Sequence, residues 1–425
     1  MDTNIKRKYI QILREELIPA EGCTEPIALA LCAAKAKETL SKMPEKIIVY
    51  ASGNIIKNTK SVTVPNTNGK KGIEAAVIYG AAAGCADRKL EVLQDIDIEK
   101  SKIAEGLFSA PGYVEVRHLA SDSALHIIVE VSAEEQTALV EIKDEHTNII
   151  RIEKNGKAIF RKDEAPSESA DNSLDRSFME LKGIIEFAEN VPLDEVKEII
   201  ELQIKCNMRI AKEGLSGDYG VNTGKLLLAS YDNDVRIRCA AEAAAGSDAR
   251  MGGAEFPVVI NSGSGNQGMT VSIPVIEYAR SMDADDNQLI RALIISNLTA
   301  VYQKRGIGRL SAYCGAVSAA GAAIAGIAWL DGSSYEVISH TITNTLGSIS
   351  GMICDGAKAS CAVKIAAALN TAFMGYELAR HHQVFRDGEG IVKKDVDKTI
   401  DAVGMMASRG MMQTDEEIVR IMINN

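Results

Sequence analysis

Three cysteines near the C-terminal end of the sequence, Cys314, Cys354 and Cys361, each lie beside glycine or another small residue. Small neighbours leave room for a bulky inorganic cluster and bring backbone N–H groups close to its sulfides. Three thiolates on a four-iron cluster would leave one iron free to bind a substrate as a Lewis acid. By spacing alone, structural cysteines remain the alternative.

A fourth cysteine, Cys23, lies in the tight loop 19–26, directly before a predicted helix N-terminus that should lower its pKa. Zinc fits the sequence poorly, because C-x-x-C pairs and a partner at finger spacing are missing. The six histidines do not organise into a site, and the adjacent His381 and His382 would diverge on a helix. The remaining cysteines are expected to be small buried hydrophobic residues in helical stretches: Cys32, Cys85, Cys206 and Cys239.

The segment 263–268 reads Gly-Ser-Gly-Asn-Gln-Gly and matches the glycine pattern of dinucleotide-binding loops. We reject that interpretation, because Pro274 should interrupt the following helix and no repeated strand–helix–strand pattern surrounds the segment. A loop that binds a substrate carboxylate through neutral donors suits an acidic protein better, with an ordinary turn as the alternative. The candidate substrate-binding residues here are Ser262, Ser264, Gly265, Asn266 and Gln267.

Two other polar stretches offer ligand contacts. Arg250 lies in the glycine-rich segment 246–253, which is interpreted either as a carboxylate clamp or as a surface turn. Asn66 lies in the loop 52–72, which is rich in Asn, Thr, Lys and Gly and is expected by default to be solvated. The other candidate ligand contacts of this loop are Lys57, Asn58 and Lys71.

Composition limits the class of protein. The 425 residues carry a net charge of −11, which argues against binding to nucleic acid phosphates. The most apolar stretch, 315–330, is shorter than the ~18 to 20 residues that cross a bilayer and predicts a buried Ala/Gly helix. Eight cysteines without an export signal indicate a reducing cytoplasm. We therefore expect a cytoplasmic protein with a small-molecule substrate, no nucleic acid or membrane partner, and a possible homo-oligomer.

The first part of the chain predicts two helices followed by strands. Residues 3–18 form an amphipathic pattern, and a second helix to about residue 41 should be capped by Thr24, with Pro26 in its first turn. Asn155-Gly156 predicts a two-residue hairpin turn. The expected strands are 46–51, 114–116, 125–131, 138–142, 149–152 and 158–160.

The sequence thus predicts an α+β fold in which a small α+β domain with an antiparallel sheet, residues 46–161, is inserted into a mainly helical domain. The helical catalytic domain would comprise residues 1–45 and 176–425, and the polar segment 162–175 reads as a linker. The expected later helices are 176–190, 193–213, 222–230, 234–246, 284–304, 312–330, 335–350, 357–380 and 395–408.

Several separate segments, in the same order, resemble the bacterial and archaeal L-cysteine desulfidase family, a relative of the α subunit of iron–sulfur L-serine dehydratases. These segments are Glu21-Gly-Cys-Thr-Glu-Pro26, Asn261-Ser-Gly-Ser-Gly-Asn-Gln-Gly268, Tyr313-Cys-Gly315 and Gly351-Met-Ile-Cys-Asp-Gly356. The similarity spans nearly the whole chain.

The resemblance implies a 4Fe-4S cluster and the α,β-elimination of L-cysteine to pyruvate, ammonia and sulfide. It implies that Cys314, Cys354 and Cys361 are the cluster ligands and that the loop at 263–268 lines the amino-acid site. An open iron would act as a Lewis acid on the substrate.

Two departures separate this chain from the serine enzymes. The interval between Cys354 and Cys361 is shorter, and Gly22-Cys23-Thr24 stands where those enzymes carry Ser-His-Thr. Cys23 is therefore expected either to be the catalytic thiolate base or to be a fourth cluster ligand that the substrate displaces. Dehydration of L-serine or a related hydroxy compound, and a non-catalytic amino-acid sensor, are the competing hypotheses.

Overall fold

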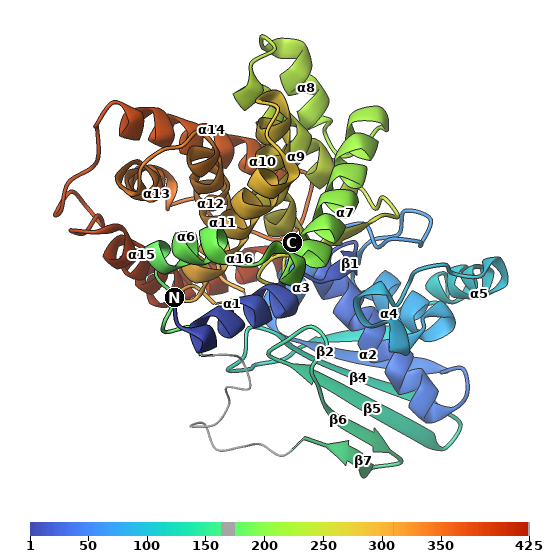
Figure 1. Ribbon diagram of the computed structural model, residues 1–425. Coiled ribbons are helices and arrows are strands. Elements are labelled where there is room, and N and C mark those ends of the chain that lie inside the picture. Colours follow the sequence, from blue (N-terminus) through green and yellow to red (C-terminus); the bar gives the residue numbers. More distant parts are fainter. Residues whose placement is uncertain (163–174, 309, 424–425) are drawn as a thin grey trace.

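The computed structural model describes residues 1–162, 175–308 and 310–423. A large helical body lies beside a sheet that is covered on one face by helices (Figure 1). This arrangement confirms the predicted α+β class with a mainly helical body. The predicted linker, 162–175, falls almost entirely outside the described residues.

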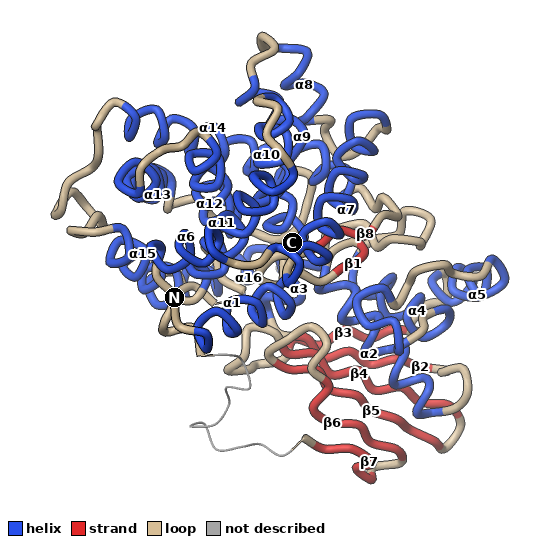
Figure 2. The backbone as a smooth tube through the Cα atoms, in the orientation of Figure 1, coloured by secondary structure: helices blue, strands red, loops and turns tan. Residues whose placement is uncertain are grey.

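The sheet has six strands in the order β3-β2-β4-β5-β6-β7 (Figure 2). Its strands are β2 (Lys46–Ala51), β3 (Val114–His118), β4 (His126–Ala133), β5 (Gln136–Lys143), β6 (Ile149–Lys154) and β7 (Lys157–Arg161). Neighbouring strands are antiparallel, as predicted, except that β2 and β3 are parallel, so the sheet is mixed. Three helices separate β2 from β3 in sequence, and such a long crossover connection permits parallel pairing.

One face of the sheet is buried under α2 (Thr24–Leu40). Burial alternates along β4, so that Ile127, Val129 and Val131 are fully buried beneath the helix while the residues between them are half-buried. The predicted Asn155-Gly156 turn joins β6 and β7, and both residues have positive φ, as a type I′ turn requires. Although α2 precedes the predicted inserted segment, it therefore packs as part of the sheet layer.

Three helices between β2 and β3 were missed by the sequence: α3 (Gly53–Thr59), α4 (Gly72–Ala83) and α5 (Ile98–Phe108). The expectation of a solvated loop over 52–72 is wrong for its first part, because α3 buries Lys57, Asn58 and Thr59. Seven residues are too few for a helical periodicity to be recognised, and such short helices depend on tertiary packing.

The helical body is built from α1 and the helices after residue 175. They are α1 (Thr3–Glu16), α6 (Leu181–Asn190), α7 (Lys197–Ser216), α8 (Thr223–Ser230), α9 (Val235–Met251), α10 (Gly265–Ser281), α11 (Asp286–Lys304), α12 (Gly315–Leu330), α13 (Tyr335–Ile349), α14 (Ser360–Arg380), α15 (Val396–Met405) and α16 (Met412–Ile423). A two-stranded ribbon of β1 (Pro19–Glu21) and β8 (Pro257–Val259) accompanies them.

Helix α12 occupies the centre of the body, where it contacts α10, α11, α13 and α14. Its alanines and glycines allow close approach: a Cβ on Gly326 would lie 2.7 Å from the carbonyl oxygen of Ala292. The expected buried Ala/Gly helix is thus confirmed. In the part of the chain that the structure describes, no helix is long and apolar enough to cross a bilayer.

Two local predictions about the helical body are wrong. Helix α10 continues through Pro274, although a proline inside a helix removes one hydrogen bond and costs about 3 kcal/mol. Its neighbours Ile273 and Val275 are fully buried, and this burial offsets the cost. The segment 246–251 is the last part of α9 rather than a turn, so Arg250 projects from a helix.

Candidate active site

Four cysteines from three separate regions of the sequence line one cavity of about 110 Å³. They are Cys23, Cys314, Cys354 and Cys361. The other walls come from the starts of α2 and α10, the ends of α9 and α11, and α3. The remaining cysteines lie elsewhere: Cys32 and Cys239 are buried in helices, Cys206 is half-buried in α7, and Cys85 is exposed before a short 3₁₀ turn, not within a helix.

A short antiparallel bridge between Tyr313 and Ile353 brings two of the cysteine segments together. The backbone N–H of Cys314 donates to the carbonyl of Met352 at 3.0 Å, and that of Cys354 donates to the carbonyl of Ala312 at 2.6 Å. These bonds place the two cysteines beside each other although forty positions separate them.

The turn between Cys354 and Cys361 is fixed by charge and by close backbone packing. Asp355 is paired with Lys358 at 2.6 Å and also with Lys364. Gly356 has a φ of +97°, and a Cβ there would lie 2.3 Å from the Lys57 carbonyl oxygen. Only glycine fits this position, and the turn directs Cys361, in the first turn of α14, toward the cavity.

The three C-terminal thiols influence one another. Burial raises the pKa of Cys314 to about 12, and the neighbouring Cys354 contributes to the shift. Burial also raises the pKa of Cys361, with a further contribution from Cys354. Three half-buried thiols beside one another form a donor set that suits a metal group, because metal binding deprotonates cysteine and the metal's positive charge stabilises the thiolates.

The three thiols line one cavity, and this arrangement can be compared with the ligand sets of metal groups. Among the described residues, no three His, Cys, Asp or Glu side chains are close enough together to share one metal ion. Thiolates of an iron–sulfur cluster bind different irons, so their sulfur atoms lie further apart than ligands of one ion. Cys314, Cys354 and Cys361 around one cavity therefore fit a multi-iron group.

Cys23 is hydrogen-bonded to a buried carboxylate. Its Sγ donates to Oε2 of Glu25 at 3.2 Å, and burial together with this negative charge raises the pKa of Cys23 well above its ordinary value. The prediction of a lowered pKa is therefore wrong, although Cys23 does occupy the N-cap position of α2. Thr24, which was expected to be the cap, instead donates its hydroxyl to the Gly263 carbonyl at 3.0 Å.

Glu25 has partners on both oxygens. Oε1 accepts a hydrogen bond from Asn58 Nδ2 at 2.9 Å, and the Nε2 atom of His146 lies 3.9 Å from the same oxygen. Burial alone would raise the pKa of Glu25, but His146 and the Cys23 thiol outweigh it and hold the pKa at about 2. Glu25 is thus an ionised carboxylate in the interior, between a thiol and an imidazole.

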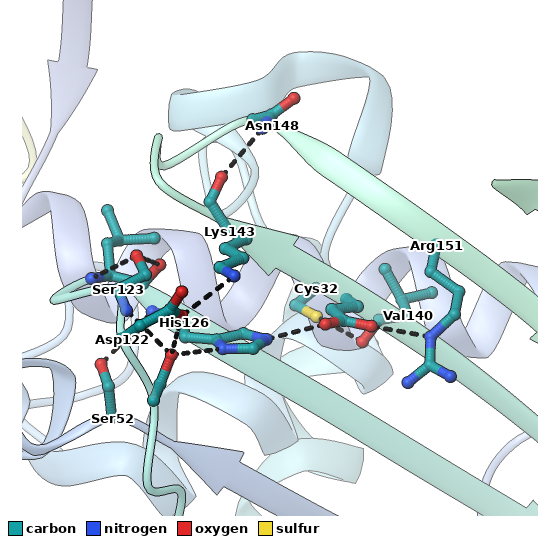
Figure 3. Close-up of polar contacts among 12 residues, drawn as sticks. Cys32, Ser52, Asp122, Ser123, His126, Val140, Lys143, Asn148 and Arg151 are labelled. Atoms are coloured by element: carbon teal, nitrogen blue, oxygen red, sulfur yellow. Dashed lines mark hydrogen bonds and ion pairs between the residues drawn. The ribbon is translucent and has the colours of Figure 1, made fainter. Parts of the chain in front are cut away.

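His146 is a site residue that the sequence analysis missed. It lies in the loop between β5 and β6, and it is buried. This loop is anchored at the end of the sheet, where Asn148 Nδ2 donates to the Lys143 carbonyl at 2.9 Å and Lys143 pairs with Asp122 at 3.1 Å (Figure 3). No periodicity or spacing marks a single histidine in a polar hairpin, so only the fold brings it to Glu25.

The same end of the sheet carries a chain of polar contacts centred on His126. The imidazole lies 2.8 Å from Ser121 Oγ and 2.7 Å from Glu141 Oε1, and Arg151 Nε donates to the other Glu141 oxygen at 2.7 Å (Figure 3). These contacts tie β4, β5 and β6 together beside the loop that carries His146.

The glycine loop contributes part of its predicted residues to the cavity. Ser264, Asn266 and Gln267 line it, whereas Ser262 and Gly265 do not. Ser262 donates to Asn261 Oδ1 at 2.9 Å, and a Cβ on Gly265 would lie 2.3 Å from Arg250 Nε. Asn66 also lies outside the cavity lining: its amide donates to Glu21 Oε1 at 3.0 Å and to the Leu93 carbonyl at 2.8 Å.

Arg250 and Gln267, both buried at the cavity, have hydrogen-bonding atoms with no partner among the described residues. Arg250 is 2% exposed and donates through one terminal nitrogen to Asn266 at 3.2 Å, while its Nε is unpaired. The Oε1 atom of Gln267 is also unpaired, and its side chain lies against Gly315, where a Cβ would be 2.5 Å away. Lys304, also missed by the sequence analysis, lines the same cavity. The unpaired atoms of Arg250 and Gln267 are suited to a polar ligand.

The cavity thus combines thiols, an ionised carboxylate, two cations and several side-chain amides, a set that suits a small zwitterionic amino acid. The profile of the serine dehydratase alpha chain family matches residues 87–420. The chain therefore belongs to the serine dehydratase alpha chain family, a lyase-type enzyme family, and the resemblance predicted from the sequence is confirmed.

The curated relatives span the whole chain. A UPF0597 protein of Lachnoclostridium phytofermentans is 52% identical over 418 residues, covering 98% of this chain and 100% of the relative. A UPF0597 protein of Treponema denticola is 46% identical over 430 residues, covering 100% of both chains. A UPF0597 protein of Finegoldia magna is 45% identical over 420 residues, covering 98% of this chain and 99% of the relative.

Proposed function

We propose that this protein catalyses the α,β-elimination of L-cysteine to pyruvate, ammonia and sulfide. The observation that carries the proposal is the convergence of Cys23, Cys314, Cys354 and Cys361 on one cavity that also holds Arg250. Family membership supports a lyase of the dehydratase type. The second candidate, dehydration of L-serine, is favoured by the family's description.

In this proposal Cys314, Cys354 and Cys361 would hold a 4Fe-4S cluster, which would supply a Lewis acid for the leaving group. Burial raises the pKa of Cys314 and of Cys361, and the positive charge of Lys364 opposes this rise. A nearby positive charge of this kind would favour the thiolate forms that bind a cluster. The backbone turn at Gly356 holds two of the three thiols in place.

Arg250, Lys304 and Gln267 bind the substrate. The unpaired guanidinium nitrogen of Arg250 and the ammonium of Lys304 are suited to the α-carboxylate, and the unpaired Gln267 oxygen can accept a hydrogen bond from the α-amino group. Together these contacts would place Cα between the cysteine ligands and the Cys23–Glu25 pair.

Cys23, Glu25 and His146 handle the proton. Cys23 is a neutral thiol that donates to Glu25, so it becomes a base only after its proton passes along Glu25 toward His146. The His146 imidazole would take up the proton, and the neighbouring Glu25 carboxylate would stabilise the imidazolium that forms. The Cys23 thiolate then removes the Cα proton, the Cα–H electrons form the Cα=Cβ bond, and sulfide leaves with the Cβ–S electrons. Aminoacrylate tautomerises and hydrolyses to pyruvate and ammonium.

Anaerobic reconstitution with iron and sulfide, followed by assays of pyruvate and sulfide, tests this function. We expect pyruvate and sulfide from L-cysteine at a higher kcat/KM than pyruvate from L-serine. A higher kcat/KM for L-serine would instead identify this site as that of an L-serine dehydratase. Binding of amino acid without any pyruvate, in protein with full iron content, would contradict both activities and leave the sensor hypothesis.

The role of Cys23 is tested separately by Cys23→Ser. If Cys23 is the base, this variant should keep the cluster's visible absorption, and its turnover should fall by about 10²–10⁴-fold. Loss of the absorption in this variant would instead identify Cys23 as a fourth ligand.

A further inference from the structure

We propose that the C-terminal helix α16 positions the active site through Asp415, which fixes helix α3 and so the Glu25 carboxylate. This inference rests on the proposed function. Helix α16 lies beside α3 although the two helices are at opposite ends of the sequence (Figure 1). Asp415 would act as a positioning residue, not as a catalytic residue.

The contact between the two helices is an ion pair between a buried lysine and a half-buried aspartate. Lys57 on α3 is 1% exposed, and its ammonium pairs with Oδ1 of Asp415. Asn54, one turn earlier on α3, donates its amide to Oδ2 of Asp415 at 2.6 Å. Both carboxylate oxygens therefore hold the same short helix. Removing the Asp415 carboxylate would leave the buried Lys57 ammonium without a compensating charge. The ion pair therefore favours the position of α3 in which Lys57 reaches Asp415.

Helix α3 in turn contacts two features of the cavity: the Glu25 carboxylate and the turn between Cys354 and Cys361. Asn58, the residue after Lys57, donates to Oε1 of Glu25 at 2.9 Å. The carbonyl of Lys57 lies against Gly356, in the turn between Cys354 and Cys361. A shift of α3 would therefore move both the proton-handling carboxylate and the turn that carries two cysteines.

The C-terminal segment also supports the opposite wall. Ser311, which lines the cavity, donates to the carbonyl of Ala407 at 2.9 Å and accepts from the backbone N–H of Tyr313 at 3.1 Å. Tyr313 precedes Cys314. Residues 407–415 therefore hold two walls of the cavity, one on α3 and one before α12.

The groups proposed to bind the substrate, Arg250 and Lys304, project from α9 and α11 in the helical body. Loosening α3 should consequently affect proton transfer more than binding. We expect Asp415→Asn to lower kcat roughly tenfold, as partial loss of a positioned acid–base group does, and to leave KM within about twofold. Amide hydrogen exchange in α3 should become faster in the same variant.

Glu417→Gln is the matched control, because Glu417 lies on the same helix but pairs only with the exposed Arg420 among the contacts described. This variant should leave kcat, KM and exchange in α3 unchanged. Lys57→Met gives a second test without a buried unpaired ammonium, and should reproduce the fall in kcat if Asp415→Asn fails to fold.

Equal kcat and equal exchange in α3 for Asp415→Asn and Glu417→Gln would overturn the proposal. A rise in KM without a fall in kcat would also overturn it, because the helix would then act on substrate binding. If the wild-type protein eliminates from neither amino acid while Asp415→Asn still accelerates exchange in α3, the helix contact stands and the proposed function fails.

Discussion

Glu25 Oε1 and His146 Nε2 lie 3.9 Å apart in the interior of the protein, one at the start of α2 and the other in a hairpin loop of the sheet. The Cys23 thiol approaches the other oxygen of the same carboxylate. The sheet layer therefore does more than pack against α2: it places an imidazole next to Glu25, which lines a cavity whose cysteines come mostly from the helical body.

This relationship makes His146→Asn an informative substitution. We expect turnover to fall by about 10²–10⁴-fold, because the proton from Cys23 loses its final acceptor. The visible absorption of the reconstituted protein should not change, since His146 is not among the proposed ligands. His118→Asn, at an exposed position of the same sheet, is the control. Activity of His146→Asn equal to that of His118→Asn would remove the imidazole from the mechanism.

The three proposed ligands are tested by single alanine substitutions of Cys314, Cys354 and Cys361. Each variant should retain much less iron after anaerobic reconstitution than the wild type, because a cluster that loses one of three thiolates is exposed to displacement. Iron and sulfide content measured after desalting gives the result. Cys206→Ala, outside the cavity lining, should retain the wild-type content. Full iron content in any of the three variants would exclude that cysteine as a required ligand.

Gly356→Ala should reduce iron retention without touching any thiol. The added Cβ would lie 2.3 Å from the Lys57 carbonyl oxygen, and φ is +97°, so the turn between two proposed ligands must shift. Gly351→Ala is a close control, because a Cβ there meets nothing within 4 Å. Iron content after reconstitution should separate the two variants; equal retention would show that the turn tolerates displacement.

Stability should depend on pH through two neighbouring carboxyl groups, half-buried Glu242 and buried Glu277, which lie outside the cavity lining. Burial, and next the charge of Glu277, raise the pKa of Glu242 to about 7 from its ordinary value of 4.5. Because the raised pKa means that the folded state binds the proton more tightly, this group destabilises the fold increasingly as pH rises from about 5 to about 8.

Glu242→Gln should therefore raise the Tm relative to wild type at pH 8 and change it little at pH 5. Thermal unfolding followed by circular dichroism at the two pH values measures this difference. Glu198→Gln, at an exposed position of α7, should show no such dependence. A gap in Tm that is equal at both pH values would contradict the assignment.

The spacing of hydrophobic residues along the sequence was sufficient to predict many of the helices and strands. The alternating pattern of 125–131 predicts β4, and the Asn155-Gly156 pair predicts its turn, because both signals arise from neighbouring residues. The sequence failed where packing overrides local preference. Helix α10 continues through Pro274 because the flanking residues are buried, and α3, with seven residues, is too short to show a pattern of its own.

For the site, the sequence by itself determined the chemistry that was present: cysteines beside small residues, a loop of neutral donors and an acidic chain without an excess of basic residues. Only the tertiary structure decided which of these groups meet. It brought Cys23 to the other three cysteines, placed Asn66 and Ser262 outside the cavity lining, added Glu25 and Lys304 to that lining, and placed His146 next to Glu25. The physical reason is that residue type and spacing report local conformation and burial, whereas a site made from distant segments depends on how helices and sheet pack together.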